Sequence, residues 1–192
     1  MNAKLNSVKT SRGYHHGDLR AALLDAAEQV VAERGIDGFS LRECARRAGV
    51  SPAAPAHHFG DARGLLTALA TRAFAALSDS LATSPTSKDA IADLHALGAA
   101  YVAFAFARPA LFDLMWRRAR LDGDDPAFIA AADAAFDPLA GAVARVTGGA
   151  PDRADVLAAW SMVHGYARLA LDGAVPPDTR PPLAEVVRRL VL

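Results

Sequence analysis

The chain has 192 residues, no net formal charge and a single cysteine, and its composition indicates a helical globular protein. Its 45 alanines far outnumber its 23 valines, isoleucines and threonines, which favours helices over strands, and 52% hydrophobic residues can bury one large or two small cores. One cysteine, Cys44, excludes an intramolecular disulfide and a zinc site built from several cysteines. We expect this thiol to be packed in the core of a cytoplasmic protein.

Neither a secretory signal nor a membrane span is expected. The first twelve residues are polar, and the longest apolar run, 96–107, is shorter than a helix needs to cross about 30 Å of hydrocarbon, so we expect it in a buried core helix. Lysine and arginine outnumber aspartate and glutamate nine to seven in residues 1–64, which also hold four of the six histidines; acids outnumber bases fourteen to twelve thereafter. This small asymmetry does not identify a nucleic-acid partner by itself.

The first sixty residues predict three helices of unequal length. Apolar residues recur at three-four spacing through residues 19–34, and a glycine follows them. Ser40 begins the pattern S-x-x-E, a capping box, and predicts a short helix over 41–48. Ser51 is placed to cap a third helix over 52–59, with a proline at its first position.

A fourth amphipathic helix, capped by Asp61, is expected to run up to the Ser, Thr and Pro residues at 83–87. Pro and Gly residues divide the rest of the chain into further predicted helices. Their approximate ranges are 88–107, 109–120, 126–147, 152–172 and 181–191. We therefore predict an all-α fold of two domains, residues 16–76 and 77–192.

The two short helices flank a turn that contains Gly49, which is the plan of a helix-turn-helix DNA-binding unit. Ala45 and Ala48 are small where the two helices must cross closely. Val50 and Phe59 supply apolar contacts that hold the second short helix at a fixed angle. Its exposed side can then enter a major groove.

Residues 40–66, SLRECARRAGVSPAAPAHHFGDARGLL, resemble the DNA-binding segment of the tetracycline-repressor (TetR) family of bacterial transcriptional regulators. Residues 13–35 resemble the first helix of that family, and residues 160–165, WSMVHG, resemble the W-x-x-x-H-G signature of one subgroup. The resemblance implies an N-terminal three-helix DNA-binding domain and a C-terminal helical domain for ligand binding and dimerisation. It also implies a homodimer that a small-molecule effector releases from a roughly palindromic double-stranded DNA operator, with no cofactor or metal.

The resemblance also implies a set of DNA-binding residues, in which the two serines meet phosphates and the residues of the second short helix face the groove. They are Ser40, Arg46, Ser51, Pro52, Ala53, Ala54, Ala56, His57, His58 and Arg63. The family usually has Leu, Tyr and Lys where this chain has Pro55, Ala56 and Ala62. Arg63, His57 and the basic residues Lys4, Lys9 and Arg12 are the candidates to replace the lost phosphate contacts. For His57 and His58 the alternative is simple exposure at a helix end.

The C-terminal half is rich enough in aromatic residues and methionine to line a cavity for a largely apolar effector. The predicted ligand-binding residues are His95, Tyr101, Phe104, Phe112, Met115, Trp116 and Phe128. For each of them the alternative is plain core packing. Asp122 and Asp124 superficially resemble a calcium loop, but a polar loop that caps a helix at Asp125 fits the sequence better.

Gly165 lies within a predicted helix that is otherwise rich in small residues, which indicates close approach of another helix, either across a dimer or inside one subunit. The predicted dimer-interface residues are Ala158, Met162, Gly165, Leu183, Val187 and Leu190. No catalytic or nucleotide-binding motif occurs, so we do not expect an enzyme. An architectural DNA-binding protein without a ligand switch is the alternative function, although the modest basic charge counts against it.

Overall fold

The computed structural model describes residues 16–150 and 152–189, and within these ranges the regular structure is entirely helical. The predicted all-α fold is therefore confirmed. In chain order the elements are α1 (His16–Arg34), α2 (Leu41–Arg47), α3 (Ala54–Phe59), α4 (Ala62–Ala82), α5 (Ala90–Ala107), α6 (Pro109–Trp116), the 3-10 turn η1 (Arg118–Arg120), α7 (Pro126–Thr147), α8 (Arg153–Leu171) and α9 (Leu183–Val187).

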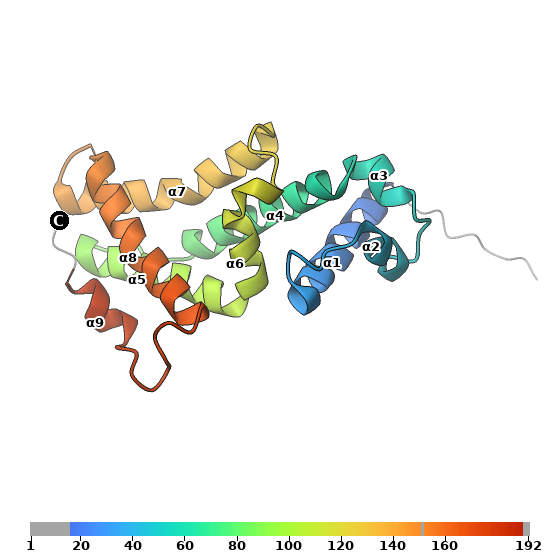
Figure 1. Cartoon of the computed structure of the whole chain (residues 1–192). Coiled ribbons are helices and arrows are strands. Elements are labelled where there is room, and N and C mark those ends of the chain that lie inside the picture. Colours follow the sequence, from blue (N-terminus) through green and yellow to red (C-terminus); the bar gives the residue numbers. More distant parts are fainter. Residues whose placement is uncertain (1–15, 151, 190–192) are drawn as a thin grey trace, which may run out of the picture.

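The long helix α4 connects the two ends of the molecule. Figure 1 shows α1, α2 and α3 gathered at one end and α5 to α9 at the other, with α4 running from α3 into the second group. Near its start α4 packs against α1 and α3, and further along it packs against α5, α6 and most extensively α7. One helix therefore contacts both α3 and the helices of the second group.

The turn between α2 and α3 forms as predicted at Gly49. This glycine has a positive φ of 67°, a left-handed conformation that residues with a Cβ adopt only with strain. The Val50 N–H donates to the Ala45 carbonyl (3.0 Å) and the Gly49 N–H to the Arg46 carbonyl (3.3 Å), so the last carbonyls of α2 are satisfied. The chain can then turn sharply into the segment that leads to α3.

The predicted start of the third helix is wrong. The helix begins at Ala54 rather than after Ser51, and Pro55 occupies its second position. A proline ring clashes with the carbonyl four residues earlier, so a helix through Pro55 could not include the Ser51 carbonyl. That carbonyl instead accepts a turn hydrogen bond from the Ala54 N–H (3.0 Å), and Pro55 sits in the first turn, where a missing N–H leaves no helical bond unmade.

Aspartate side chains cap the N-termini of four of the longer helices. Asp61 accepts from the backbone N–H of residue 64 and Asp125 from that of residue 128, both at 2.8 Å, while Asp89 and Asp152 cap α5 and α8 in the same way. The helix-capping interpretation of Asp125 is thereby confirmed, and α7 has the predicted bounds. The helix predicted over 109–120 instead ends at Trp116 and continues as η1, and the described part of the last helix is only five residues long.

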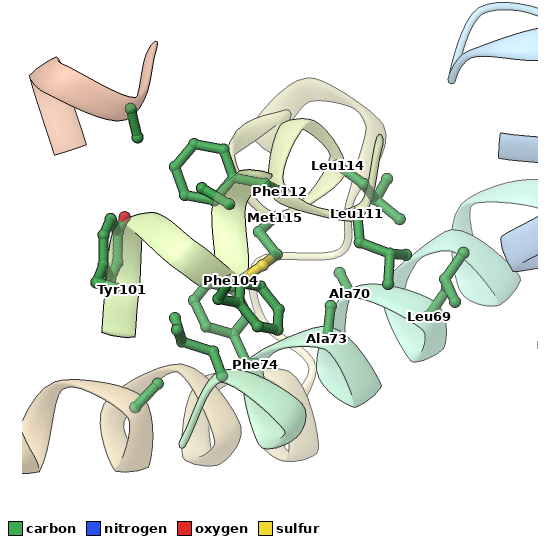
Figure 2. Packing of buried hydrophobic residues seen from close by; sticks show 14 of the residues in the cluster. Leu69, Ala70, Ala73, Phe74, Tyr101, Phe104, Leu111, Phe112, Leu114 and Met115 are labelled. Carbon is green, nitrogen blue, oxygen red and sulfur yellow. The ribbon is translucent and has the colours of Figure 1, made fainter. Parts of the chain in front are cut away.

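The core lies where α4, α5 and α6 meet. Figure 2 shows Phe74 of α4, Phe104 of α5 and Met115 of α6 pointing toward one another. The Phe74 ring also makes edge-to-face contacts with Trp116 (5.5 Å between centroids) and Phe128 (5.6 Å). These contacts connect α4, α6 and α7 through one aromatic side chain.

Two further contacts join α4 to its neighbours. Pro138 lies inside α7 and has no N–H to donate to the Ala134 carbonyl, and the Ser78 hydroxyl of α4 donates to that carbonyl instead (3.3 Å). Nearer the start of α4, the Thr67 hydroxyl accepts from the backbone N–H of Asp122, in the segment after η1 (2.8 Å). These hydrogen bonds thus join α4 directly to α7 and to the segment after η1.

Among the described helices, α4, α5 and α7 are long and apolar enough to cross a membrane when judged by length and composition alone. Residues 96–107, the apolar run that is itself too short to cross a membrane, belong to the 18-residue helix α5. In the fold these helices pack against one another, and the α5 residues Tyr101, Val102 and Ala105 are buried as the sequence predicted.

Candidate DNA-binding face and ligand cavity

The segment from Ser51 to His58 presents one outward face. Ser51, Pro52, Ala53, Ala56 and His57 are exposed, and Ala54 and His58 are half-buried. Pro55 is buried against the domain, so it fixes the helix rather than facing outward. Most of the predicted groove-facing residues are thus accessible, and the groups that they expose are mainly methyl groups and a proline ring, with one hydroxyl and one imidazole. Such a surface can approach DNA closely but offers few bidentate base contacts.

The capping box predicted at Ser40 does not form. Ser40 is in the N-cap position with an extended backbone, but its side chain makes no capping hydrogen bond in the described structure. Glu43, the other half of the box, instead accepts hydrogen bonds from Arg34 (3.2 Å), Arg46 (2.8 and 2.9 Å) and Arg47 (2.9 Å). Bonds between charged groups are stronger than a neutral backbone bond. These arginines lower the pKa of Glu43 to about 2, with Arg46 the largest contributor.

Arg46 and Arg47 are neighbours in sequence with different roles. The Arg47 guanidinium is largely buried between Glu43 and Glu33. It donates two hydrogen bonds to the Glu33 carboxylate (2.5 and 2.7 Å) in addition to the one to Glu43. The Arg46 side chain is 69% exposed and bonds only its helix neighbour Glu43 among the described residues. Of the two, Arg46 is the one that can reach a phosphate without breaking the packing between α1 and α2.

Arg63 was predicted to contact DNA, but the structure directs it elsewhere. Its Nη2 donates to the carbonyl of Leu121 (2.7 Å), a contact between the start of α4 and the segment after η1. Arg120, one residue before Leu121, donates to the Ile36 carbonyl (3.2 Å) and to Asp37 (3.0 Å) in the loop after α1. In this conformation both arginines join the two halves of the molecule. The predicted contributors Lys4, Lys9 and Arg12 lie outside the described residues.

A cavity of about 40 Å³ lies within the C-terminal group of helices. Its walls come from α4, α5, α7, α8 and α9 and from the last residue of α6. The lining residues are Leu77, Leu81, Leu94, His95, Leu97, Gly98, Tyr101, Trp116, Ala135, Phe136, Leu139, Ala159, Trp160, Met162, Val163 and Val187. Three predicted ligand-binding residues, His95, Tyr101 and Trp116, are therefore brought together at one site.

The other four predicted ligand-binding residues do not line this cavity. Phe104, Phe112, Met115 and Phe128 are at most 7% exposed and fill the core around α4 and α6. Aromatic content alone could not separate core from cavity, because the two kinds of residue occupy different faces of the same helices. Trp160 is a cavity residue that the prediction missed, although it had a signal in the W-x-x-x-H-G motif.

A buried polar network borders the cavity. The Tyr101 hydroxyl lies 2.8 Å from Nδ1 of His164 and accepts a hydrogen bond from Nε1 of Trp160 (3.3 Å). Burial and the nearby Arg168 lower the pKa of His164, and burial raises the pKa of Tyr101. Both shifts favour the neutral forms, in which the tyrosine donates to the unprotonated Nδ1. The tyrosine hydroxyl is thus fully engaged by α8.

The outer face of α8 is open and apolar. Leu157 and Leu169 are more than half exposed, Ala158 is exposed, and a Cβ built on Gly165 would meet no described atom within 4 Å. The alternative that Gly165 allows close packing inside the subunit is therefore not what the structure shows. Beside Gly165, a groove of about 320 Å³ runs between α8 and the segment around α9.

The predicted dimer residues divide into three groups. Ala158 and Gly165 lie on the open face, while Met162 and Leu183 are half-buried, and Met162 also lines the cavity. Val187 is wrongly predicted, because it is 5% exposed and faces the cavity of its own subunit, packed by the contact of α9 with α5. Leu190 lies outside the described residues.

Comparison with known families assigns both halves of this architecture. The profile described as "Bacterial regulatory proteins, tetR family" matches residues 23–69, and the profile described as "Tetracyclin repressor-like, C-terminal domain" matches residues 94–192, more than half of the chain. The chain belongs to the TetR family. It is accordingly a DNA-binding transcriptional regulator of the helix-turn-helix type.

Individual relatives agree with the assignment. A protein of unknown function from Rhodococcus sp. RHA1 is 38% identical, with 92% of this chain and 93% of that chain covered and a TM-score of 0.75. The TetR family transcriptional regulator PfmR from Thermus thermophilus shares the fold at 24% identity, with 88% and 99% covered and a TM-score of 0.64. The uncharacterized HTH-type transcriptional regulator YobS of Bacillus subtilis is 28% identical over 91 residues. That match covers 47% of this chain and about half, 48%, of the relative.

Proposed function

We propose that this TetR-family regulator is a cytoplasmic repressor that binds a roughly palindromic operator as a homodimer and is released by a largely apolar small molecule. The observation that carries the proposal is the shared use of α4. This helix contributes Leu77 and Leu81 to the cavity wall and packs against the DNA-binding helix α3 at its other end. An effector that displaces the α4 part of the cavity wall therefore also displaces the DNA-binding helix α3.

The size of the cavity supports a switch driven by displacement. Small-molecule pockets usually have volumes of about 300 to 1,000 Å³, so the space of about 40 Å³ holds only a few waters. A larger effector must push α4, α7 or the end of α6 outward. A coupling free energy of about 1 to 3 kcal/mol would change operator affinity roughly 5- to 150-fold. We place the DNA-binding domain at residues 16–76 and the effector-binding domain at 77–192.

Dimerisation through the open face of α8 completes the proposal. Its small and apolar residues suit a two-fold helix contact, with Gly165 allowing the backbones to approach. A dimer sets the spacing of its two α3 helices, which must match half-sites about 34 to 36 Å apart or a multiple of that distance. The motif from Trp160 to Gly165 supports placement in the W-x-x-x-H-G subgroup, since it supplies both a cavity residue and the open glycine.

Contact with the operator is assigned to the outward face of α3 and its approach. The proposed residues are Ser40, Arg46, Ser51, Pro52, Ala53, Ala54, Ala56, His57 and His58. With so few side chains able to bond base edges, thymine methyl contacts and DNA shape would carry much of the specificity.

The test is an unbiased selection of double-stranded DNA by the purified chain, followed by footprinting with and without apolar compounds. We expect an inverted repeat that Ala56→Glu binds at least about tenfold more weakly, because its carboxylate repels phosphates. Ala103→Glu, which adds the same charge on an exposed position of α5, should bind normally. Uniform binding of all duplexes with a steep salt dependence would instead identify an architectural protein, and no duplex binding would refute the proposal.

A further inference from the structure

Trp116, in the cavity wall, carries a buried polar group without a partner in the described part of the chain. Nε1 of Trp116 is buried and has no hydrogen-bond partner among the described residues, where Ser84 Oγ is the one other such side-chain atom. An indole N–H can only donate. A buried donor without an acceptor destabilises a protein, so buried polar groups are nearly always paired. Because Trp116 also lines the cavity, a ligand that widens the cavity beside the indole can supply the missing acceptor.

The Trp116 ring is held in place by aromatic neighbours. Its centroid lies 4.9 Å from that of His164, 5.3 Å from that of Trp160 and 5.5 Å from that of Phe74. The first and third contacts are edge-to-face, with interplanar angles of 81° and 84°, so the ring is enclosed from several sides. The indole therefore cannot turn freely to find an acceptor elsewhere, and its donor is preorganised.

Two other polar side chains at the cavity, those of Trp160 and Tyr101, are already hydrogen-bonded within the protein. The indole N–H of Trp160 donates to Tyr101, whose hydroxyl in turn pairs with His164. Trp116 and Trp160 thus present the same chemical group at one cavity, one without a partner and one with a partner. This contrast makes Trp160 the natural control for Trp116.

The walls favour an uncharged ligand. None of the sixteen lining residues is an aspartate, glutamate, lysine or arginine. The nearest carboxylate along α5, Asp93, is occupied by Arg145 and by the backbone N–H and hydroxyl of Ser87. Burying an unpaired charge among apolar walls is very unfavourable, and an ammonium group would find no carboxylate here. His95 is the one described lining side chain that could pair with a carboxylate, so an uncharged molecule fits these mainly apolar walls best.

We propose that the effector is an uncharged, largely apolar molecule that presents one acceptor oxygen, as in a ketone or ester, to the indole N–H of Trp116. This inference rests on the effector-binding role proposed above and specifies its chemistry. The acceptor fixes the orientation of the molecule, while Leu77, Phe136 and the other apolar walls contact the rest of it. Trp116 is the last residue of α6 and is followed by the segment in which Arg120 bonds Ile36 and Asp37, in the loop after α1.

The experiment compares 1-indanone with indane, two neutral bicyclic molecules that differ by a carbonyl in place of a methylene. Binding of each to the full chain is measured by calorimetry for the wild type, Trp116→Phe and Trp160→Phe. The measured quantity is the ratio of the indane Kd to the indanone Kd, which cancels effects of each substitution on cavity size. We expect Trp116→Phe to lower this ratio roughly fivefold, the worth of one net hydrogen bond. Trp160→Phe should leave it nearly unchanged.

A second measurement does not depend on the variants folding. The chain has two tryptophans, so its indole N–H groups give two proton–nitrogen NMR signals. Indanone should move the Trp116 signal downfield, as a new hydrogen bond does, and indane should not.

A ratio of the indane Kd to the indanone Kd that is the same in all three proteins, or that falls equally in both variants, would overturn the proposed acceptor contact. It would leave the repressor function standing if operator binding and its release by other apolar compounds persist. Absence of binding by both probes would overturn the ligand class, and failure of every apolar compound to release the operator would overturn the effector function itself.

Discussion

The Tyr101 hydroxyl offers a quantitative test of the buried network. Tyr101→Phe removes one oxygen and leaves two buried groups, Nε1 of Trp160 and Nδ1 of His164, without their partner. Leaving a buried polar group unsatisfied costs about 1 to 3 kcal/mol. The Trp160 contact is long at 3.3 Å and His164 is only half-buried, so we expect a combined loss near the middle of that range, about 2 kcal/mol.

Chemical denaturation followed by circular dichroism measures this loss directly. A destabilisation of about 2 kcal/mol should lower Tm by about 4 to 8 °C in a chain of this length and should reduce the denaturation midpoint without changing the slope. Tyr166→Phe is the matched control, because it deletes the same atom from an exposed hydrogen bond to the Pro181 carbonyl. It should cost at most about 0.5 kcal/mol. Equal losses in the two variants would refute the argument that burial makes the Tyr101 network strong.

Three other predictions follow from burial and exposure. Burial and Arg168 lower the folded-state pKa of His164, so its contribution to stability is fully present above the unfolded value of about 6.5 and is lost as pH falls. The free energy of unfolding should therefore decline as pH falls below about 6.5, and it should decline less steeply in His164→Gln. Leu157→Glu, on the open face of α8, should produce monomers in sedimentation experiments, whereas Ile129→Glu, on an exposed position of α7, should not; a dimer in both would place the interface elsewhere. Phe112→Ala should lose about 3 to 5 kcal/mol of stability, because the side chain is core rather than cavity wall, and a stable variant altered only in ligand binding would contradict that assignment.

Local features of the fold could be predicted because the responsible atoms are close in sequence. Asp125 caps α7 through a backbone N–H three residues away, and Gly49 ends α2 through its own positive φ. The same is true of the helix-turn-helix plan and of the family it resembles. Where the capping box failed, charged neighbours had competed for Glu43. Arg46 and Arg47, three and four residues away, bond its carboxylate, and Arg34 of α1 adds a third contact.

The sequence by itself determined that this is a helical TetR-family regulator with its reader near the N-terminus, because capping residues, glycines and apolar periodicity act within a few positions of the chain. Only the tertiary structure decided which aromatic residues fill the core and which line the cavity. Phe112 and Trp116 are one helical turn apart on α6, yet the first is core and the second carries the buried donor without a partner. Likewise Val187 faces the cavity of its own subunit, although an apolar residue at this position was also compatible with a dimer interface. The physical reason is that the burial of a side chain depends on which helix packs against it, and the packing of the helices depends on the whole chain.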